Sequence, residues 1–517
     1  MFKQARWLLS TLLLALLLPR GAAAGDFIDT RISFTLGDDN FFKDAGQTIP
    51  DSPLINIGDR EGYELPFDNL DLATTGRENE LHLVLYKKVE GILPGLTTEA
   101  AAAMQIDMAG LVGDGGVFSD DSSYIRLVYA IDPNRRGDRY LDLVLFPLSG
   151  DRFRVGYLYD LTWGGADMFP RLKGPSPAFK LGGNHGVFYW WGGMKMVLAE
   201  TALDESANLQ GLTLETSEYE TLYSGLFGLG TEPIPGLSVD LSGGYVQMGR
   251  NPVKDVANEL VTATGFSARL AYGQGLRVGL SSDLRLLRND VQFLESLSRR
   301  PRYEDGLSWR VALEGNAIAQ TLADPDLYAA TTRQWASAAA FDARMQYDHL
   351  RVNLTAVYRS LEFSLLNTPS FVPFTAFSED AIVQPQVFGA VSADYFFERW
   401  ALMPGIQAGV EMPASVKTEV FASIGNAPPS LVGVFDVLVR TTGERIILPA
   451  GEERVPIYSA RITTRWYPSE MLTLLAFVII AYDENSTRLE INADLTKSRV
   501  FQDPFILGAG ITAQARF

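Results

Sequence analysis

The sequence predicts an all-β protein that crosses a membrane as a single antiparallel β-barrel of about 16 or 18 strands. Strict alternation of apolar and polar residues recurs along the 517-residue chain, and this period of two is typical of strands. Past the N-terminus no stretch is long and apolar enough for a membrane helix. The most apolar one, Leu472–Tyr482, has the length of a strand and is bounded by polar turn residues.

The alternating stretches each carry one apolar face. In Phe153–Trp163 the odd positions are mostly aromatic, whereas Arg154 and Asp160 fall on the other face. Similar stretches are Phe266–Tyr272, Leu276–Leu286, Phe341–Tyr347, Val352–Tyr358 and Ala460–Trp466. Aromatic residues close several apolar faces, as expected where strands meet the two membrane interfaces. The alternative interpretation is a large soluble β-protein with one solvated face.

The N-terminus has the pattern of a secretory signal peptide. Lys3 and Arg6 precede the apolar stretch Trp7–Leu18, and Ala22–Ala24 offers small residues for cleavage. We therefore expect a signal peptide at residues 1–24 and one domain, the barrel, at residues 25–517. Removing the three basic leader residues would change the net charge from −18 to −21.

The last stretch, Phe505–Phe517, is apolar at every second position, counted back from its final phenylalanine. An amphipathic strand that ends in Phe resembles the closing strand of Gram-negative outer-membrane β-barrels. The chain also looks similar to an uncharacterised porin-like family, through the segment GDREGYELPFDN at residues 58–69. These resemblances imply a bacterial outer-membrane location, with Phe517 as the signal read by the outer-membrane assembly machinery.

The stretches between the predicted strands fall into two length classes, as a barrel requires. The tight turns are Ser149–Asp151, Gly273–Gly275, Asp348–His349, Glu398–Arg399 and Pro468–Glu470, and we expect them to face the periplasm. The long connections are Gly37–Asn79, Gly164–Gly186, Asn289–Asp305, Asn367–Pro385, Pro413–Pro456 and Asp483–Pro504, and we expect them outside. Pro413–Pro456 also predicts its own hairpin, Val432–Arg440 turning back to Leu448.

The connection Gly37–Asn79 is dense in acidic residues, glycine and proline. It could lie on the surface, fold into the barrel as a constriction, or bind calcium through carboxylates. The candidate ligands would be Asp38, Asp39, Asp59, Glu61 and Glu64.

The composition argues against most kinds of catalytic and metal-binding site. The chain has no cysteine and three histidines, so thiolate chemistry and cysteine metal sites are absent from the sequence. No catalytic motif built on Ser, His or a glycine-rich loop occurs. The net charge of −18 argues against nucleic acid as a partner. We expect no enzyme activity and no cofactor.

If the apolar faces contact lipid, the polar faces line the lumen. The predicted lumen-lining residues are Arg154, Asp160, Arg269, Arg277, Asp283, Arg285, Arg310, Glu314, Asp342, Arg344, Arg359, Arg461 and Arg465. Charges in a water-filled pore cost little. The expected function is therefore a porin-like channel for passive diffusion of small polar solutes. A structural or surface-interaction barrel with a salt-bridged, closed lumen is an alternative, and a transporter of hydrophobic compounds is another. Outer-membrane lipids and lipopolysaccharide would be the surrounding partners, and the sequence leaves the oligomeric state undetermined.

Overall fold

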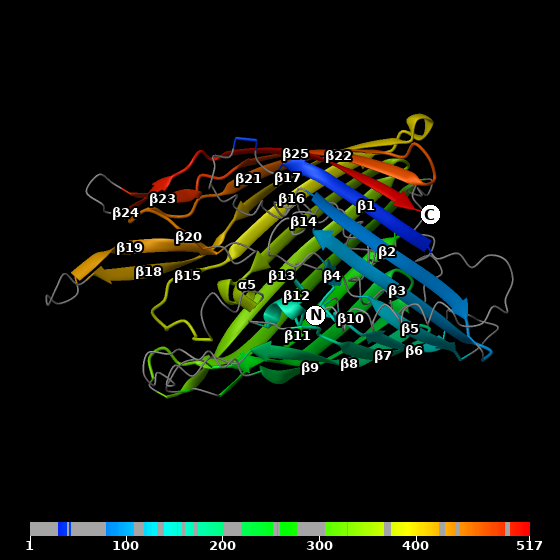
Figure 1. Cartoon of the computed structure of the whole chain (residues 1–517), viewed down its shortest axis with the longest axis horizontal. Coiled ribbons are helices and arrows are strands. Elements are labelled where there is room, and N and C mark those ends of the chain that lie inside the picture. The colour runs from blue at the N-terminus through cyan, green and yellow to red at the C-terminus, as the bar shows by residue number, and fades with distance from the viewer. Residues whose placement is uncertain are drawn as a thin grey trace.

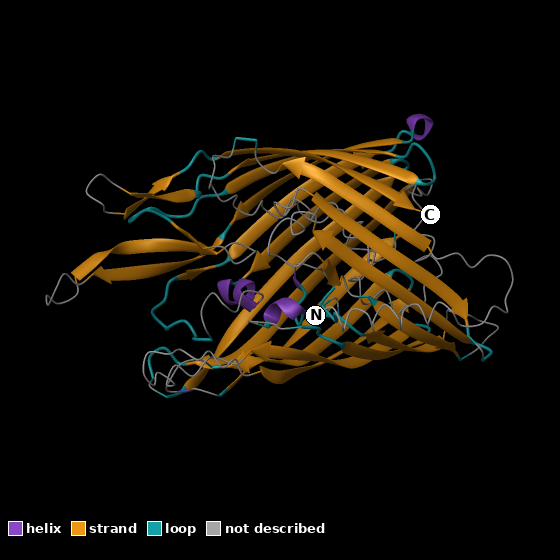
Figure 2. Cartoon of the chain, viewed as in Figure 1, coloured by secondary structure: helices purple, strands orange, loops and turns teal. Residues whose placement is uncertain are grey.

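The computed structural model describes most of the chain between residues 29 and 516. The described residues are 29–38, 41–42, 79–91, 93–107, 118–120, 123–131, 139–151, 153–157, 161–169, 174–200, 219–251, 256, 259–276, 306–327, 329–366, 374–422, 430–439, 445–491 and 497–516. They form long antiparallel strands with only short helices (Figure 2). No helix in this described part of the chain is long and apolar enough to cross a membrane.

Antiparallel strands pair in sequence order around an interior (Figure 1), and the last of them, β25, also pairs with the first, β1. Each of these ring strands therefore has a partner on both sides. The ring strands are β1 (Asp29–Asp38), β2 (Asn79–Glu90), β3 (Leu96–Asp107), β5 (Tyr124–Ala130), β6 (Arg139–Phe146), β7 (Ala178–His185), β8 (Phe188–Glu200), β9 (Tyr219–Ile234), β10 (Leu237–Arg250), β11 (Leu260–Gln274), β12 (Leu307–Ala323), β13 (Thr331–Tyr347), β14 (Leu350–Arg359), β16 (Gln386–Tyr395), β17 (Leu402–Met412), β21 (Ile457–Trp466), β22 (Leu472–Tyr482) and β25 (Phe505–Arg516).

The remaining elements are small. A short strand, β4 (Phe118–Asp120), pairs with the end of β3. A separate sheet joins β15 (Val383–Gln384), β18 (Ala414–Ala422), β19 (Ser430–Val439) and β20 (Arg445–Ile447), and β23 (Thr487–Ile491) forms a hairpin with β24 (Lys497–Phe501). This sheet and this hairpin extend beyond one end of the ring, at the left of Figure 1. The helices among the described residues are η4 (Ala166–Met168), α5 (Leu361–Leu366) and η7 (Glu398–Trp400).

Most ring strands expose apolar side chains outside, and many of them bury polar side chains inside, whereas β22 buries Leu475, Phe477 and Ile479. On β11, Phe266 and Leu270 are 62% and 52% exposed, whereas their neighbours Ser267 and Arg269 are almost fully buried. The side chains of a strand alternate between its two faces, so the exposed apolar residues share the outer face and the buried polar ones the inner face. This distribution is the reverse of that in a soluble protein, where large apolar side chains are mostly buried.

Several predicted strands are confirmed. Phe266–Tyr272, Phe341–Tyr347, Val352–Tyr358 and Ala460–Trp466 lie in β11, β13, β14 and β21, and Leu472–Tyr482 is β22. The predicted hairpin that turns back to Leu448 is present as β19 and β20. The stretch Leu276–Leu286 lies almost wholly outside the described residues, and β11 pairs directly with β12. Most of Gly37–Asn79 is also outside the described part, including four of the five candidate calcium ligands.

The prediction of a membrane strand at Phe153–Trp163 is wrong. Its apolar side chains are buried in the interior instead of facing outward, and a single antiparallel bridge joins Val155 to Trp163. Alternation alone does not locate such a stretch, because an apolar face is also buried when it packs inside the ring. Two connection assignments change with it. Ser149–Asp151 is no tight turn between ring strands, and Gly164–Gly186 contains the ring strand β7.

Candidate functional site

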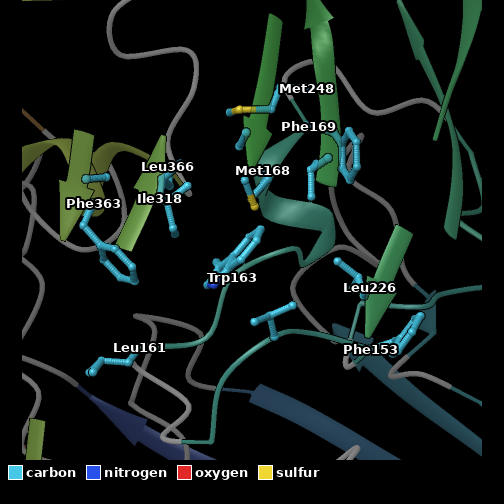
Figure 3. Close-up of a cluster of buried hydrophobic side chains, with 14 of the residues drawn as sticks. Phe153, Leu161, Trp163, Met168, Phe169, Leu226, Met248, Ile318, Phe363 and Leu366 are labelled. Carbon is cyan, nitrogen blue, oxygen red and sulfur yellow. The ribbon is translucent and has the colours of Figure 1, made fainter. Parts of the chain in front are cut away.

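The connection between β6 and β7 enters the ring and packs against its inner wall. We call residues 151–169 the inward segment; positions 152 and 158–160 in it lie outside the described part. Phe153, Leu161 and Trp163 are at most 1% exposed. They pack with inward residues of the wall such as Leu226 and Ile318 (Figure 3). This part of the ring interior therefore contains a packed apolar core.

Polar groups of the wall hold the backbone of the inward segment in place. The carboxylate of Glu314 accepts a 3.0 Å hydrogen bond from the Tyr157 amide, and the Asn316 side chain donates one of 2.8 Å to the Leu161 carbonyl. The Trp163 indole donates to the hydroxyl of Ser267 over 3.2 Å. These contacts satisfy backbone groups that burial would otherwise leave without partners.

The connection between β14 and β16 supplies a second piece of this core. Phe363 and Leu366 of α5 are buried, and Figure 3 shows them on one side of Trp163 with Met168 and Phe169 on the other. The chain then follows the end of β12, where the Ala323 amide donates to the Phe374 carbonyl over 2.8 Å. Two connections far apart in sequence thus meet inside the ring.

Charged side chains of the inner wall pair with one another. Arg269 donates to Asp240 over 2.5 Å, and the hydroxyl groups of Tyr189 and Ser238 donate to the same carboxylate. The Arg269 guanidinium also lies 4.5 Å from the ring centre of Tyr157, so this pair contacts the inward segment. Each partner offsets part of the cost of burying the others.

A similar pairing joins β3, β5 and β6. Arg126 lies 2.9 Å from Asp142 and 3.6 Å from Glu99, and all three side chains are almost fully buried. A further ion pair joins β12 and β13, where the Arg310 guanidinium lies 3.7 Å from the Asp342 carboxylate. Ion pairs thus recur around the inner wall.

A row of polar side chains crosses the wall from β13 to β21. In register on five adjacent strands, from β13 to β21, lie Arg344, Asn353, Ser392, Gln407 and Arg461. Arg344 donates to Asn353 over 2.7 Å, and Asn353 donates to Ser392 over 3.0 Å. Because barrel strands tilt by about 35–45° from the barrel axis, a row perpendicular to the strands also advances along that axis.

The predicted lumen residues fall into three groups. Those on the inner wall are Arg269, Arg310, Glu314, Asp342, Arg344, Arg359, Arg461 and Arg465. Arg154 is buried in the interior but belongs to the inward segment. Asp160, Arg277, Asp283 and Arg285 lie outside the described residues, and so does Phe517, the predicted assembly signal.

Sequence reasoning missed two inner lysines. Lys180 and Lys195 have no exposed surface, and Lys195 donates to the Gly164 carbonyl over 2.7 Å. Each lies between two large apolar residues, Phe179 and Leu181 in one case and two methionines in the other. That alternation was the available signal, but the strands were not recognised because the glycines beside them interrupt the pattern.

Basic residues outnumber acidic ones among the buried charges of the ring strands and the inward segment. Among the described residues, nine basic side chains and six acidic ones are buried there, an excess of three positive charges. They are Arg126, Arg154, Lys180, Lys195, Arg269, Arg310, Arg359, Arg461 and Arg465 against Glu99, Asp142, Asp240, Glu314, Asp342 and Glu411. The described residues contain no group of three or more His, Asp or Glu side chains able to hold a metal ion.

Comparison with known proteins gives matches to solved structures. No family model matches the chain, and no curated protein sequence matches it either. Among solved structures, Pseudomonas aeruginosa OpdK is 8% identical with a TM-score of 0.44, over 96% of this chain and 100% of that one. Pseudomonas aeruginosa OccD3 (OpdP) is 8% identical with a TM-score of 0.42, over 96% and 92%. Wzi of Escherichia coli, described as a carbohydrate-binding outer-membrane β-barrel, is 10% identical with a TM-score of 0.37, over 95% and 85%.

Proposed function

We propose that this chain is a bacterial outer-membrane channel, a closed barrel of eighteen strands that lets small polar solutes diffuse passively. The unbroken sequence of strand pairings from β1 to β25 and back supports the larger of the two expected strand numbers. The reversed polarity of the wall supports a membrane location, because exposed apolar side chains are stable where lipid surrounds them. A barrel satisfies every backbone group of its wall without water.

Aromatic residues on the outer face support a membrane-spanning wall of the right height. Trp335, the fifth residue of β13, and Tyr347, its last, lie twelve positions apart and are 64% and 55% exposed. At about 3.4 Å per residue and a tilt of about 45°, this separation corresponds to roughly 29 Å along the membrane normal. The apolar band of an outer-membrane barrel, with aromatic residues at both of its interfaces, is about 25 Å tall.

The lengths of the connections support an orientation. One end of the ring carries short connections such as 235–236 and 348–349, whereas the other carries 201–218, 360–385, 413–456 and 483–504. The connection 275–306 is an exception at the short end. Short turns of outer-membrane barrels face the periplasm and long loops face outward, so the separate sheet and the hairpin β23–β24 would be extracellular.

The charged inner wall is the observation that carries the channel proposal. A barrel that served only as a scaffold could fill its interior with apolar side chains, as the inward segment does in one part. The row from Arg344 to Arg461 instead offers hydrogen-bonding groups on adjacent strands. Such groups can replace water around a polar solute as it passes.

A specific observation favours a second candidate, a structural barrel with a salt-bridged and closed lumen. The inner ion pairs are buried to the same degree as a protein core, with Asp240 at 0% and Arg269 at 4% exposure. Exposure this low indicates a narrow passage at most. We therefore expect a conductance well below that of an unobstructed barrel of eighteen strands.

Single-channel recording in a planar bilayer separates the two candidates. The protein should be refolded in detergent and shown to be folded by heat-modifiable migration. It should then be added to the bilayer with the same high salt concentration on both sides. Discrete current steps support the channel. Folded protein that inserts without any steps over many trials would favour the closed barrel.

The outer-membrane assembly machinery, outer-membrane lipids and lipopolysaccharide are the partners that we propose. Deleting Phe517 should lower the amount of folded protein in the outer membrane and leave unfolded protein in the periplasm. Heat-modifiable migration in outer-membrane fractions measures this. An unchanged folded fraction would contradict the role of the terminal residue.

A further inference from the structure

The two ends of the inward segment meet at a single carboxylate. Asp151 accepts two 2.8 Å hydrogen bonds from the Arg154 guanidinium and one of 2.6 Å from the Ala166 amide. One side chain therefore joins the residues where the segment enters the ring to those where it leaves the core. Hydrogen bonds to an ionised group are about twice as strong as those between neutral groups.

Two further contacts complete this arrangement. The Arg154 side chain also donates to the Asp151 carbonyl over 2.8 Å, and it lies directly against Gly165, where a Cβ atom would collide with the guanidinium. Lys195 of β8 donates to the neighbouring Gly164 carbonyl over 2.7 Å, which fastens the group to the wall. Removing the Asp151 charge would leave the buried Arg154 guanidinium without its carboxylate.

We propose that Asp151 is the positioning residue of the constriction: its carboxylate holds the inward segment closed on itself and against the wall. The described residues of the segment form no strand pairing with the wall, so side-chain contacts of this kind fix it in the interior. Loss of the carboxylate would let the segment leave its place while the ring of strands stays intact. The consequence for conductance rests on the proposed channel function, but the placement of the segment does not.

The ionisation of Asp151 gives this role a pH signature. Burial by itself would raise the pKa of Asp151, but the charges of Arg154 and Lys195 and the bonds from Arg154 and Ala166 more than offset it and lower the pKa to about 2. A carboxyl with a lowered pKa stabilises the folded arrangement fully above its unfolded pKa of about 4. That contribution is lost as the pH falls from about 4 to about 2.

A thiol placed in the inward segment reports its release directly. The chain has no cysteine, so Val155→Cys, at a position with no exposed surface, creates the single thiol of the protein. A membrane-impermeant, water-soluble maleimide should label this thiol slowly in the folded barrel. Adding Asp151→Asn should raise the labelling rate by about tenfold or more, because a charged hydrogen bond contributes enough to shift a local opening equilibrium by that factor.

Matched controls separate positioning from general stability. Asp394 of β16 is the carboxylate partner of Arg351 on the wall. Asp394→Asn removes that carboxylate and should leave the labelling rate of Val155→Cys unchanged. Asp151→Glu keeps the charge and should restore slow labelling at least in part. Glu453→Cys, at a highly exposed side chain, gives the rate of full access. All variants should keep heat-modifiable migration, which shows that the barrel is folded.

The pH profile adds a readout that a merely structural role would not move. With a pyridyl disulfide, which reacts with thiols in acid, Val155→Cys should become accessible between about pH 4 and pH 2. The Asp151→Asn double variant should be accessible throughout. Equal labelling of Val155→Cys with and without Asp151→Asn would overturn the proposal.

Recording current from the same variants tests the channel consequence separately. Asp151→Asn should raise the single-channel conductance or its fluctuations, and Asp394→Asn should not. Faster labelling without any current in all variants would support the positioning role and contradict the proposed channel. Current without a labelling difference would support the channel and contradict the positioning role.

Discussion

At the scale of single residues, buried charges on the inner wall depend on their partners. The Asp240 carboxylate accepts hydrogen bonds from Arg269, Tyr189 and Ser238, and none of the Asp240 side chain is exposed. A buried pair gains little over apolar residues of the same size, but losing one partner leaves an uncompensated charge. The inner wall is therefore sensitive to single substitutions.

Asp240→Ala should lower the free energy of unfolding by about 3–5 kcal/mol, because Arg269 would stay buried without its carboxylate. Urea unfolding of the protein in lipid vesicles, followed by tryptophan fluorescence, measures this. Asp394→Ala is the control, since Asp394 and Arg351 keep 16% and 11% of their side-chain surface and water can replace the lost partner. Equal losses for the two variants would mean that water reaches Asp240 as well.

The sequence predicted the inner position of residues such as Arg269 and Glu314, because alternation within one strand is local. It did not predict their partners. The register that pairs Arg269 with Glu314 across β11 and β12, or that brings Glu314 to the Tyr157 amide, depends on residues far apart in the chain. Asp151 gave no signal at all, since a carboxylate beside a glycine is typical of any turn.

At the scale of elements, alternation predicts a strand-like chain but not its location. β22 was predicted to its exact ends, because its apolar residues lie between clear turn signals. Phe153–Trp163 shows the same period and lies in the interior. An outer apolar face contacts lipid and an inner one contacts a packed core, and both select the same residues. The structure separates the two locations because β6 pairs directly with β7, so the stretch between them is not a strand of the wall.

Leu313→Arg should lower the free energy of unfolding by about 2–4 kcal/mol, because a guanidinium near the membrane midplane is costly. Leu313 is 57% exposed and pairs with Phe341, midway between Trp335 and Tyr347 of β13. Leu327→Arg is the matched control, since Leu327 is 64% exposed in the connection after β12 and should change stability by no more than about 0.5 kcal/mol. If Leu313→Arg left the free energy of unfolding unchanged, the outer face of β12 would have to contact water and not lipid.

At the scale of the whole molecule, net charge and lumen charge have opposite signs. The chain carries −18, yet the buried charges of the ring strands and the inward segment have an excess of three positive charges. We therefore expect most of the acidic excess to lie outside this interior. Selectivity follows the charges at the narrowest part of a pore, within a Debye length of about 8 Å at physiological salt.

We therefore predict a weak preference for anions, or none, at moderate salt, although net charge alone would suggest a cation-selective pore. Lowering the salt lengthens the Debye length to about 30 Å at 0.01 M, so acidic residues far from the narrow part begin to act on a passing ion. The preference should then shift toward cations. Reversal potentials across a potassium chloride gradient at two ionic strengths measure both effects. Strong cation selectivity at high salt would contradict an inner wall dominated by arginine and lysine, and would mean that carboxylates line the narrowest part of the passage.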